Sequence, residues 1–128
     1  MPATDDHLAV ARHNEEFAKL LIAEYQDRYA DWATTALFYA AVHYGRALLA
    51  HRGCPTITSH LTFGAEFLVH TRNKRLYSMY RYMKDESERA RYDCSTHTAV
   101  EVQRLETSRL SHFRDAVLHL ISVTEKKG

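Results

Sequence analysis

The chain is poor in the residues that make tight turns and crosslinks. It has four glycines, two prolines and two cysteines among 128 residues. So few turn formers argue against a β-sandwich and against a disordered protein rich in proline and glycine. The cysteines, Cys54 and Cys94, are too few for a secreted domain stapled by disulfides, so we expect two free thiols in a reducing cytoplasm.

Long apolar runs are also missing. No stretch approaches the ~20 residues that a membrane span needs, and the N-terminal sequence MPATDDHLAV lacks the pattern of a signal peptide. We therefore expect a cytoplasmic protein with no membrane partner. The formal net charge is only +1, although residues 1–40 carry three basic and seven acidic side chains and residues 41–128 carry fourteen and nine. This asymmetry is too mild to indicate nucleic-acid binding by itself.

Apolar residues at helical spacing are abundant. With the capping residues around them, they predict five helices at 5–29, 31–53, 58–70, 73–93 and 98–124. Because the connecting loops are short, we expect one all-α domain over residues 1–128, an antiparallel up-and-down bundle of four or five helices. Gly53 followed by Pro55 ends the second helix, and Thr98 with Glu101 forms a capping box at the last.

The first predicted helix is amphipathic. Its N-cap is Asp5 or Asp6, and Glu15 with Lys19 forms an i,i+4 ion pair on the solvent side. Its apolar stripe consists of Leu8, Ala11, Phe17, Leu20, Leu21 and Tyr25.

The second predicted helix, DWATTALFYAAVHYGRALLAHRG, begins with Asp31 as its N-cap and is apolar nearly all the way round, which is typical of a central helix. It nevertheless carries His43 and Arg46, and a buried charge needs a partner. One interpretation is a hydrogen-bonded core histidine, with Arg46 paired to Glu24 or Asp27 of the first helix. The other interpretation is a pocket or dimer cleft. We assign to it Tyr39, His43 and Arg46 of this helix, together with His60, which follows it.

The residues at 31–53, Ser59-His60 and LYSMYRYMKDESERARYD at 76–93 resemble small HEPN-type helical proteins of bacteria and archaea. The shared pattern is a tryptophan, FYAA-H, a loop with SH and a late RYD, and it covers about residues 8–110. The resemblance implies a helical bundle and a homodimer. Many such proteins are ribonucleases in toxin–antitoxin or defence systems, whereas others bind RNA or nucleotides without catalysis. A nucleotidyltransferase-like partner protein is common among them.

HEPN ribonucleases use an arginine followed four to six residues later by a histidine, without a metal. Three stretches here have that spacing, which is about the number expected by chance. Only the position of a stretch in the fold can therefore indicate whether it is the catalytic motif. Arg91 and His97 lie in the expected late loop, but Tyr92 stands where an asparagine is usual. In a catalytic version, Arg91 stabilises the charged phosphorane and His97 is the acid–base, the two meeting across a dimer cleft. In the other version Arg91 pairs with Asp85 or Glu88 on its own helix, and His97 lies on the lip of a loop.

The fourth predicted helix is the best candidate for RNA contact, because basic and aromatic side chains alternate along it. We assign the contact to Arg72, Lys74, Arg75, Arg81, Lys84 and Tyr77. The alternative is a solvated helix face, partly neutralised by its own carboxylates.

The last predicted helix places His112, Asp115 and His119 on one face, but without the glutamates that bundle metal sites use. We therefore expect no metal and no cofactor. The sequence favours a small cytoplasmic, homodimeric HEPN-like protein that binds RNA, nucleotides or a partner protein without catalysis. The alternative is a metal-independent ribonuclease toxin.

Overall fold

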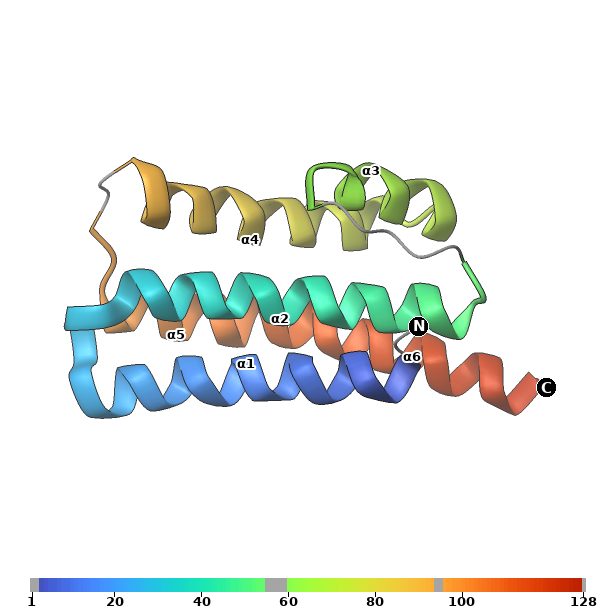
Figure 1. Cartoon of the computed structure of the whole chain (residues 1–128), viewed down its shortest axis with the longest axis horizontal. Helices are drawn as coiled ribbons and strands as arrows, with labels where there is room; N and C mark the ends of the chain where they lie inside the picture. The colour runs from blue at the N-terminus through green and yellow to red at the C-terminus, as the bar shows by residue number, and fades with distance from the viewer. Residues whose placement is uncertain (1–2, 55–59, 94–95, 128) are drawn as a thin grey trace.

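The computed structural model describes residues 3–54, 60–93 and 96–127, and no strand occurs among them (Figure 1). The all-α prediction is confirmed. The helices of the described chain are α1 (Thr4–Tyr25), a 3-10 turn η1 (Gln26–Tyr29), α2 (Ala30–His51), α3 (His60–Thr71), α4 (Lys74–Tyr92), α5 (Ala99–Leu105), a π-helical turn η2 (Glu106–Leu110) and α6 (Ser111–Lys127). The predicted helices 31–53 and 73–93 match α2 and α4 to within two residues.

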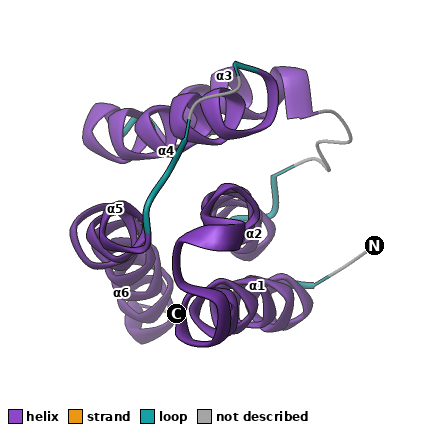
Figure 2. Cartoon of the chain, turned by 90° about the vertical axis from the view of Figure 1, so that its left-hand side faces the viewer, coloured by secondary structure: helices purple, strands orange, loops and turns teal. Residues whose placement is uncertain are grey.

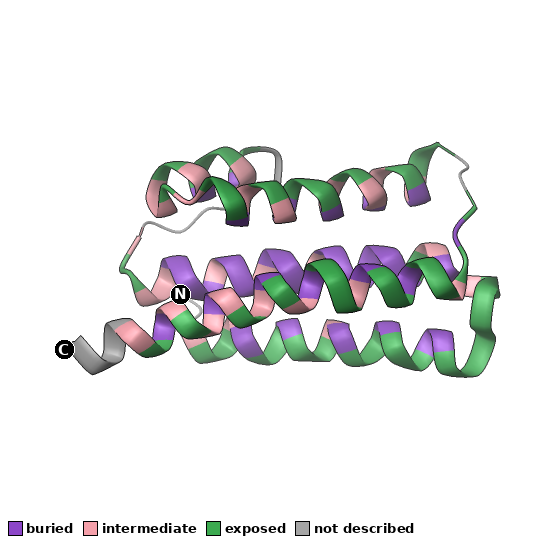
Figure 3. Ribbon diagram, turned by 180° about the vertical axis from the view of Figure 1, so that it is seen from behind, coloured by how far each residue is buried: buried purple, intermediate pink, exposed green. Residues whose placement is uncertain are grey.

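Helix α2 lies at the centre of the molecule, as its all-round apolar sequence predicts. Figure 2 shows α1 on one side of it, α5 and α6 on a second, and α3 with α4 on a third. The burial of the residues, coloured in Figure 3, agrees with this arrangement. Helix α2 is buried along most of its length, whereas α1 and α4 bury mainly the edge that faces α2. Its many small residues let the neighbouring helices approach closely, since Ala33, Ala40, Ala41 and Ala47 are fully buried.

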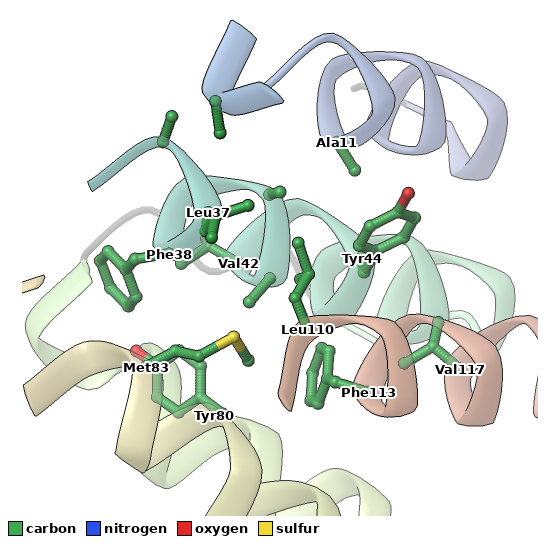
Figure 4. Close-up of a cluster of buried hydrophobic side chains, with 14 of the residues drawn as sticks. Ala11, Leu37, Phe38, Val42, Tyr44, Tyr80, Met83, Leu110, Phe113 and Val117 are labelled. Carbon is green, nitrogen blue, oxygen red and sulfur yellow. The ribbon is translucent and has the colours of Figure 1, made fainter. Parts of the chain in front are cut away.

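Aromatic rings fill the space between α2, α3, α4 and α6. Tyr80 packs against Phe38 and Phe63, with ring centroids 5.8 and 5.2 Å apart, and Phe67 packs against Phe113 at 5.8 Å. Part of this cluster is drawn in Figure 4. Gly45 makes the close contact of α2 with α3 possible, because a Cβ at this position would lie 2.7 Å from Phe63 Cζ.

The exposed face of α1 differs from the prediction. Phe17, Leu20 and Tyr25 are about half exposed, while Glu15 is 6% exposed, so the predicted stripe is wrong at these three residues and Glu15 is not on the solvent side. The buried edge of α1 combines the alanines Ala11 and Ala18 with Leu8, Leu21 and Ile22, which are at most 9% exposed. Small and large side chains therefore share this edge with the Glu15 carboxylate.

Two predicted helix ends are confirmed and two are not. The backbone N–H of Glu101 donates to Thr98 Oγ1 at 3.2 Å and the N–H of Thr98 to Glu101 Oε1 at 3.3 Å, which completes the capping box. Ala3 rather than Asp5 or Asp6 is the N-cap of α1, where its N–H donates to a first-turn carboxylate. Asp31 is not the N-cap of α2, because the chain enters this helix directly from η1.

Gly53 ends α2 in a Schellman motif. It has φ +72°, its N–H donates to the Ala50 carbonyl at 3.0 Å, and the Cys54 N–H donates to the Leu49 carbonyl at 2.9 Å. Cys54 is a free thiol, and Cys94 lies outside the described residues.

Replacing Gly53 by alanine is expected to lower the free energy of unfolding by about 1 kcal/mol. The Cβ meets no atom within 4 Å, so the cost comes only from the left-handed backbone. Urea unfolding monitored by circular dichroism measures it. Gly53→Asn, which tolerates this backbone better, should lose less, and equal stability of Gly53→Ala and wild type would contradict the assignment.

Candidate functional site

A buried polar network that the sequence did not reveal joins three helices. Tyr44 of α2 donates its hydroxyl to Glu15 Oε1 at 2.6 Å, and Arg114 of α6 donates Nη1–H to Glu15 Oε2 at 3.0 Å. The predicted pair is present too, with Lys19 Nζ 4.0 Å from the same carboxylate. Burial raises the pKa of Tyr44 well above its ordinary value, and the hydrogen bond to Glu15 makes the second-largest contribution to this rise. This network is structural, since both carboxylate oxygens are occupied.

Replacing Arg114 by alanine should cost about 3 kcal/mol of stability, because it leaves the Glu15 carboxylate buried without its guanidinium partner. The double variant Glu15→Gln/Arg114→Ala should recover part of that loss, since an amide carries no charge. Arg52→Ala, at an exposed arginine after the end of α2, is the matched control. Equal unfolding midpoints in urea for Arg114→Ala and Arg52→Ala would refute this role.

The side chain of Arg91, near the end of α4, reaches across to α2. Its Nε–H donates to the Ser87 carbonyl at 3.3 Å and its Nη1–H to Tyr39 Oη at 3.5 Å, and its guanidinium carbon is 5.0 Å from the ring centre of Tyr92. The predicted pairing with Asp85 or Glu88 is wrong. Those carboxylates point outward on α4 and pair one turn back along the helix, Asp85 with Arg81 at 3.3 Å and Glu88 with Lys84 at 3.4 Å.

His97 is a buried residue and does not lie on the lip of a loop as the alternative prediction had it. Its side chain is 4% exposed, and Nε2 lies 3.1 Å from Glu86 Oε2. Nδ1 is buried and has no hydrogen-bond partner among the described residues. Within one chain, Arg91 and His97 line different cavities on opposite sides of α4.

The cavity at His97 has a volume of about 390 Å³ and is lined by arginines from three elements. Arg89 comes from α4, Arg104 from α5 and Arg109 from η2. Its remaining lining residues are Thr34, Tyr82, Glu86, His97, Glu101, Leu105 and Ser108. We call this cavity the arginine cavity.

Arg104 and Arg109 are the available cations of the arginine cavity. Arg89 Nη1 already pairs with Glu86 Oε1 at 3.1 Å, and the Glu101 carboxylate is engaged in the capping box. In the described part of the chain, no carboxylate lies within 4.0 Å of the Arg104 or Arg109 guanidinium. The Arg109 guanidinium lies 4.1 Å from the ring centre of Tyr82, which holds it over the cavity.

The π-helical turn η2 brings these two arginines to one cavity. In an uninterrupted α-helix, side chains five residues apart point about 140° away from each other. Here the Ser111 N–H donates to the Glu106 carbonyl five residues earlier, and this wider turn rotates the later side chains about the helix axis. The helix predicted for 98–124 is present as α5, η2 and α6, with a π-helical turn that the prediction did not include. Hydroxyls accompany the turn: Thr107 Oγ1–H donates to the Gln103 carbonyl at 2.9 Å, and Ser108 Oγ–H donates to the Arg104 carbonyl.

The residues on α2 that were predicted to line a pocket or dimer cleft each contact a different neighbour. Tyr39 contacts Arg91, as described above, and His43 Nδ1 lies 3.1 Å from His7 Nδ1 of α1. Arg46 lies over the ring of Phe63, with the guanidinium carbon 5.6 Å from the ring centre. His60 begins α3, but its side chain lies outside the described residues.

The predicted pairing of Arg46 with Glu24 or Asp27 is wrong. Because α1 and α2 run in opposite directions, the C-terminal end of α1 lies beside the beginning of α2, far from Arg46 (Figure 1). Asp27 Oδ1 instead accepts the backbone N–H of Ala99 at 2.7 Å. Burial lowers the pKa of Arg46, and its Nε is buried with no hydrogen-bond partner in the described chain.

The residues predicted to contact RNA lie on or beside α4, and several of them are already engaged by neighbouring side chains. Arg81 donates to Asp85 and also, through Nη1–H, to Tyr77 Oη at 3.4 Å, while Lys84 pairs with Glu88. Arg72 and Lys74 are exposed. Arg75 lines a separate cavity of about 410 Å³, which also contains His112, Asp115 and His119 of α6. No group of three side chains that could hold a metal ion is found among the described residues.

Comparison with known proteins gives no relative: no protein-family description, curated protein or solved structure matches the chain. Among the described helices, none combines the length and the apolar character needed to cross a membrane.

The partial burial of His7 predicts a loss of stability in acid. Burial and the charge of Arg46 lower the pKa of His7 from its ordinary value of 6.5, against a smaller opposing effect of Asp6. The folded state therefore favours neutral His7, so its contribution is complete above pH 6.5 and is lost as the pH falls below that value.

The melting temperature should fall more steeply between pH 7 and pH 5 in wild type than in His7→Gln. His13→Gln, an exposed histidine of the same helix, is the control and should behave as wild type. Parallel pH profiles of wild type and His7→Gln would contradict the predicted linkage.

Proposed function

We propose that the chain is a small, HEPN-like, homodimeric protein that binds RNA without cleaving it, in a toxin–antitoxin or defence context. The arginine cavity is the proposed binding site for the RNA phosphates. A homodimer, and a nucleotidyltransferase-like partner protein, are supported by the sequence resemblance alone.

The observation that carries this function is the pair of arginines without carboxylate partners, Arg104 and Arg109, at one cavity. A guanidinium offers a planar fork of N–H donors that matches two phosphate oxygens. The charge of Arg89 is offset by Glu86, so Arg104 and Arg109 supply the available charge, and the Arg109–Tyr82 stack limits the side-chain freedom that binding would otherwise remove. π-helical turns such as η2 also occur frequently at functional sites.

Two features of His97 favour binding over catalysis. A general base must come within hydrogen-bonding distance of the hydroxyl that it deprotonates. His97 has one ring nitrogen engaged by Glu86 and the other buried, and the Arg91 of its own chain lies beside another cavity. Cleavage would need the arginine of a second subunit and exposure of this histidine.

The double variant Arg104→Ala/Arg109→Ala should bind a labelled single-stranded RNA at least about tenfold more weakly than wild type, because two charged hydrogen-bonding groups are removed. The plot of log K against log salt, measured by fluorescence anisotropy, should become shallower by about 1.4, the loss of two phosphate contacts. Arg12→Ala/Arg52→Ala removes two exposed arginines elsewhere and should leave both quantities nearly unchanged.

Equal weakening by both double variants would mean that binding is only a response to overall charge, which contradicts the assigned site. The same RNA is incubated with each protein in EDTA, and it should remain intact. Cleavage by wild type that is lost in His97→Ala would instead establish the metal-independent ribonuclease with Arg91 and His97.

A further inference from the structure

Two aromatic side chains with large exposed fractions lie at a second cavity, on the other side of α4. Trp32 of α2 is 57% exposed and Tyr92 of α4 is 70% exposed. The cavity has a volume of about 310 Å³ and is lined by Asp31, Trp32, Thr35, Ala90, Arg91 and Tyr92. Its lining residues come from the beginning of α2 and the end of α4, and these helix ends face the viewer in Figure 2. We call it the tryptophan pocket.

Arg91 supplies the tryptophan pocket with oriented hydrogen-bond donors. Its guanidinium is held by Ser87 and Tyr39 and lies within 6.0 Å of the ring centres of Phe38, Tyr39 and Tyr92. These contacts use Nε and Nη1 and leave further N–H groups of the five that a guanidinium carries. No described carboxylate pairs with Arg91 within 4.0 Å, so an acceptor-rich ligand would supply the missing partner.

Asp31 supplies the opposite chemistry in the same pocket. Its backbone carbonyl accepts the Thr35 hydroxyl at 3.0 Å, and no described residue forms an ion pair with its carboxylate. The pocket therefore has flat apolar faces, a guanidinium and a carboxylate. A simple cation would be repelled by Arg91, and a bare phosphate would be repelled by Asp31. The matching ligand is a flat neutral ring that has hydrogen-bond acceptors on one edge and donors on another.

We propose that the tryptophan pocket binds a single unstacked nucleobase of RNA, and that guanine is the preferred base. Guanine presents the acceptors O6 and N7, which arginine recognises, and the donors N1–H and N2–H, which a carboxylate accepts. Its ring would stack on Trp32 and Tyr92. This site deepens the function proposed above: the arginine cavity binds phosphates, and the tryptophan pocket reads a base.

Intrinsic fluorescence tests the pocket directly, because Trp32 is the sole tryptophan of the chain. GMP, AMP, CMP and UMP are titrated separately at fixed salt with selective excitation of the indole. GMP should quench Trp32 in a saturable way, with an apparent Kd about tenfold lower than that of UMP. Free N-acetyltryptophanamide, titrated in parallel, measures collisional quenching.

Variants that keep Trp32 identify the contributing groups. Tyr92→Leu should raise the apparent Kd for GMP by about tenfold through loss of stacking. Asp31→Asn should remove the preference for GMP over AMP. Phe17→Leu, which removes an exposed ring of α1, should titrate as wild type. Quenching no greater than that of the free indole, equal affinity for all four nucleotides, or no effect of Tyr92→Leu would each overturn the proposal.

The two sites fail separately in this design. Arg104→Ala/Arg109→Ala should keep the GMP quenching while it loses RNA affinity, and Tyr92→Leu should keep the salt dependence of RNA binding while its apparent Kd for GMP rises. If the double arginine variant binds RNA as wild type but GMP still quenches Trp32, the phosphate site is wrong and the base pocket stands. The reverse pattern overturns the base pocket alone.

Discussion

The burial of α2 on nearly every side is the constraint on which the rest of the structure depends. A helix surrounded by three groups of neighbours can present only small or apolar side chains to them, and its alanines and Gly45 meet that demand. The buried polar residues of α2 are satisfied locally or by a neighbour: Thr34 and Thr35 donate their hydroxyls to carbonyls one turn back, and Tyr44 donates to Glu15. Any ligand must therefore bind at the surfaces between helices rather than in the core.

The periodicity of α4 decides which of its charges are available. Its outward face carries i,i+4 pairs such as Arg81 with Asp85, which neutralise one another. Its flanks point in different directions, so that Glu86 and Arg89 reach the arginine cavity while Arg91 reaches the tryptophan pocket. The number of basic residues in the sequence of α4 therefore overstates the positive charge that its outer face offers to a polyanion.

Local signals in the sequence predict the local structure well. Helical spacing, the Thr98–Glu101 capping box and the Gly53 stop each depend on residues only a few positions apart, and each is present. The run of apolar residues in α2 also predicts its central position, because only a surrounded helix tolerates such a composition.

The residues whose surroundings were predicted wrongly are those whose partners lie far away along the chain. Glu15 is buried because Arg114 and Tyr44 come to it from two other helices, and nothing near position 15 indicates this. The pairing of Arg46 with Glu24 or Asp27 ignores the antiparallel direction of α1 and α2, a constraint that the short connection between them already imposes. The turn η2 had one local signal, the hydroxyls of Thr107, Ser108 and Ser111 inside a helix, where such residues bond to backbone carbonyls.

The surroundings of an arginine, rather than its distance from a histidine along the chain, decide whether its charge is available to a ligand. Arg114 is paired with the buried carboxylate of Glu15, so freeing it to bind a ligand would destabilise the fold. Arg104 and Arg109 have no such anion to release, and an incoming phosphate would meet them without breaking an ion pair. Arg91 is intermediate, because neutral acceptors and rings fix its orientation while its charge is left without a counterion. A guanidinium with a fixed orientation suits recognition of a base edge, whereas two guanidinium groups without counterions suit the phosphates of the RNA backbone. In our proposal the tryptophan pocket therefore binds a base and the arginine cavity binds phosphates.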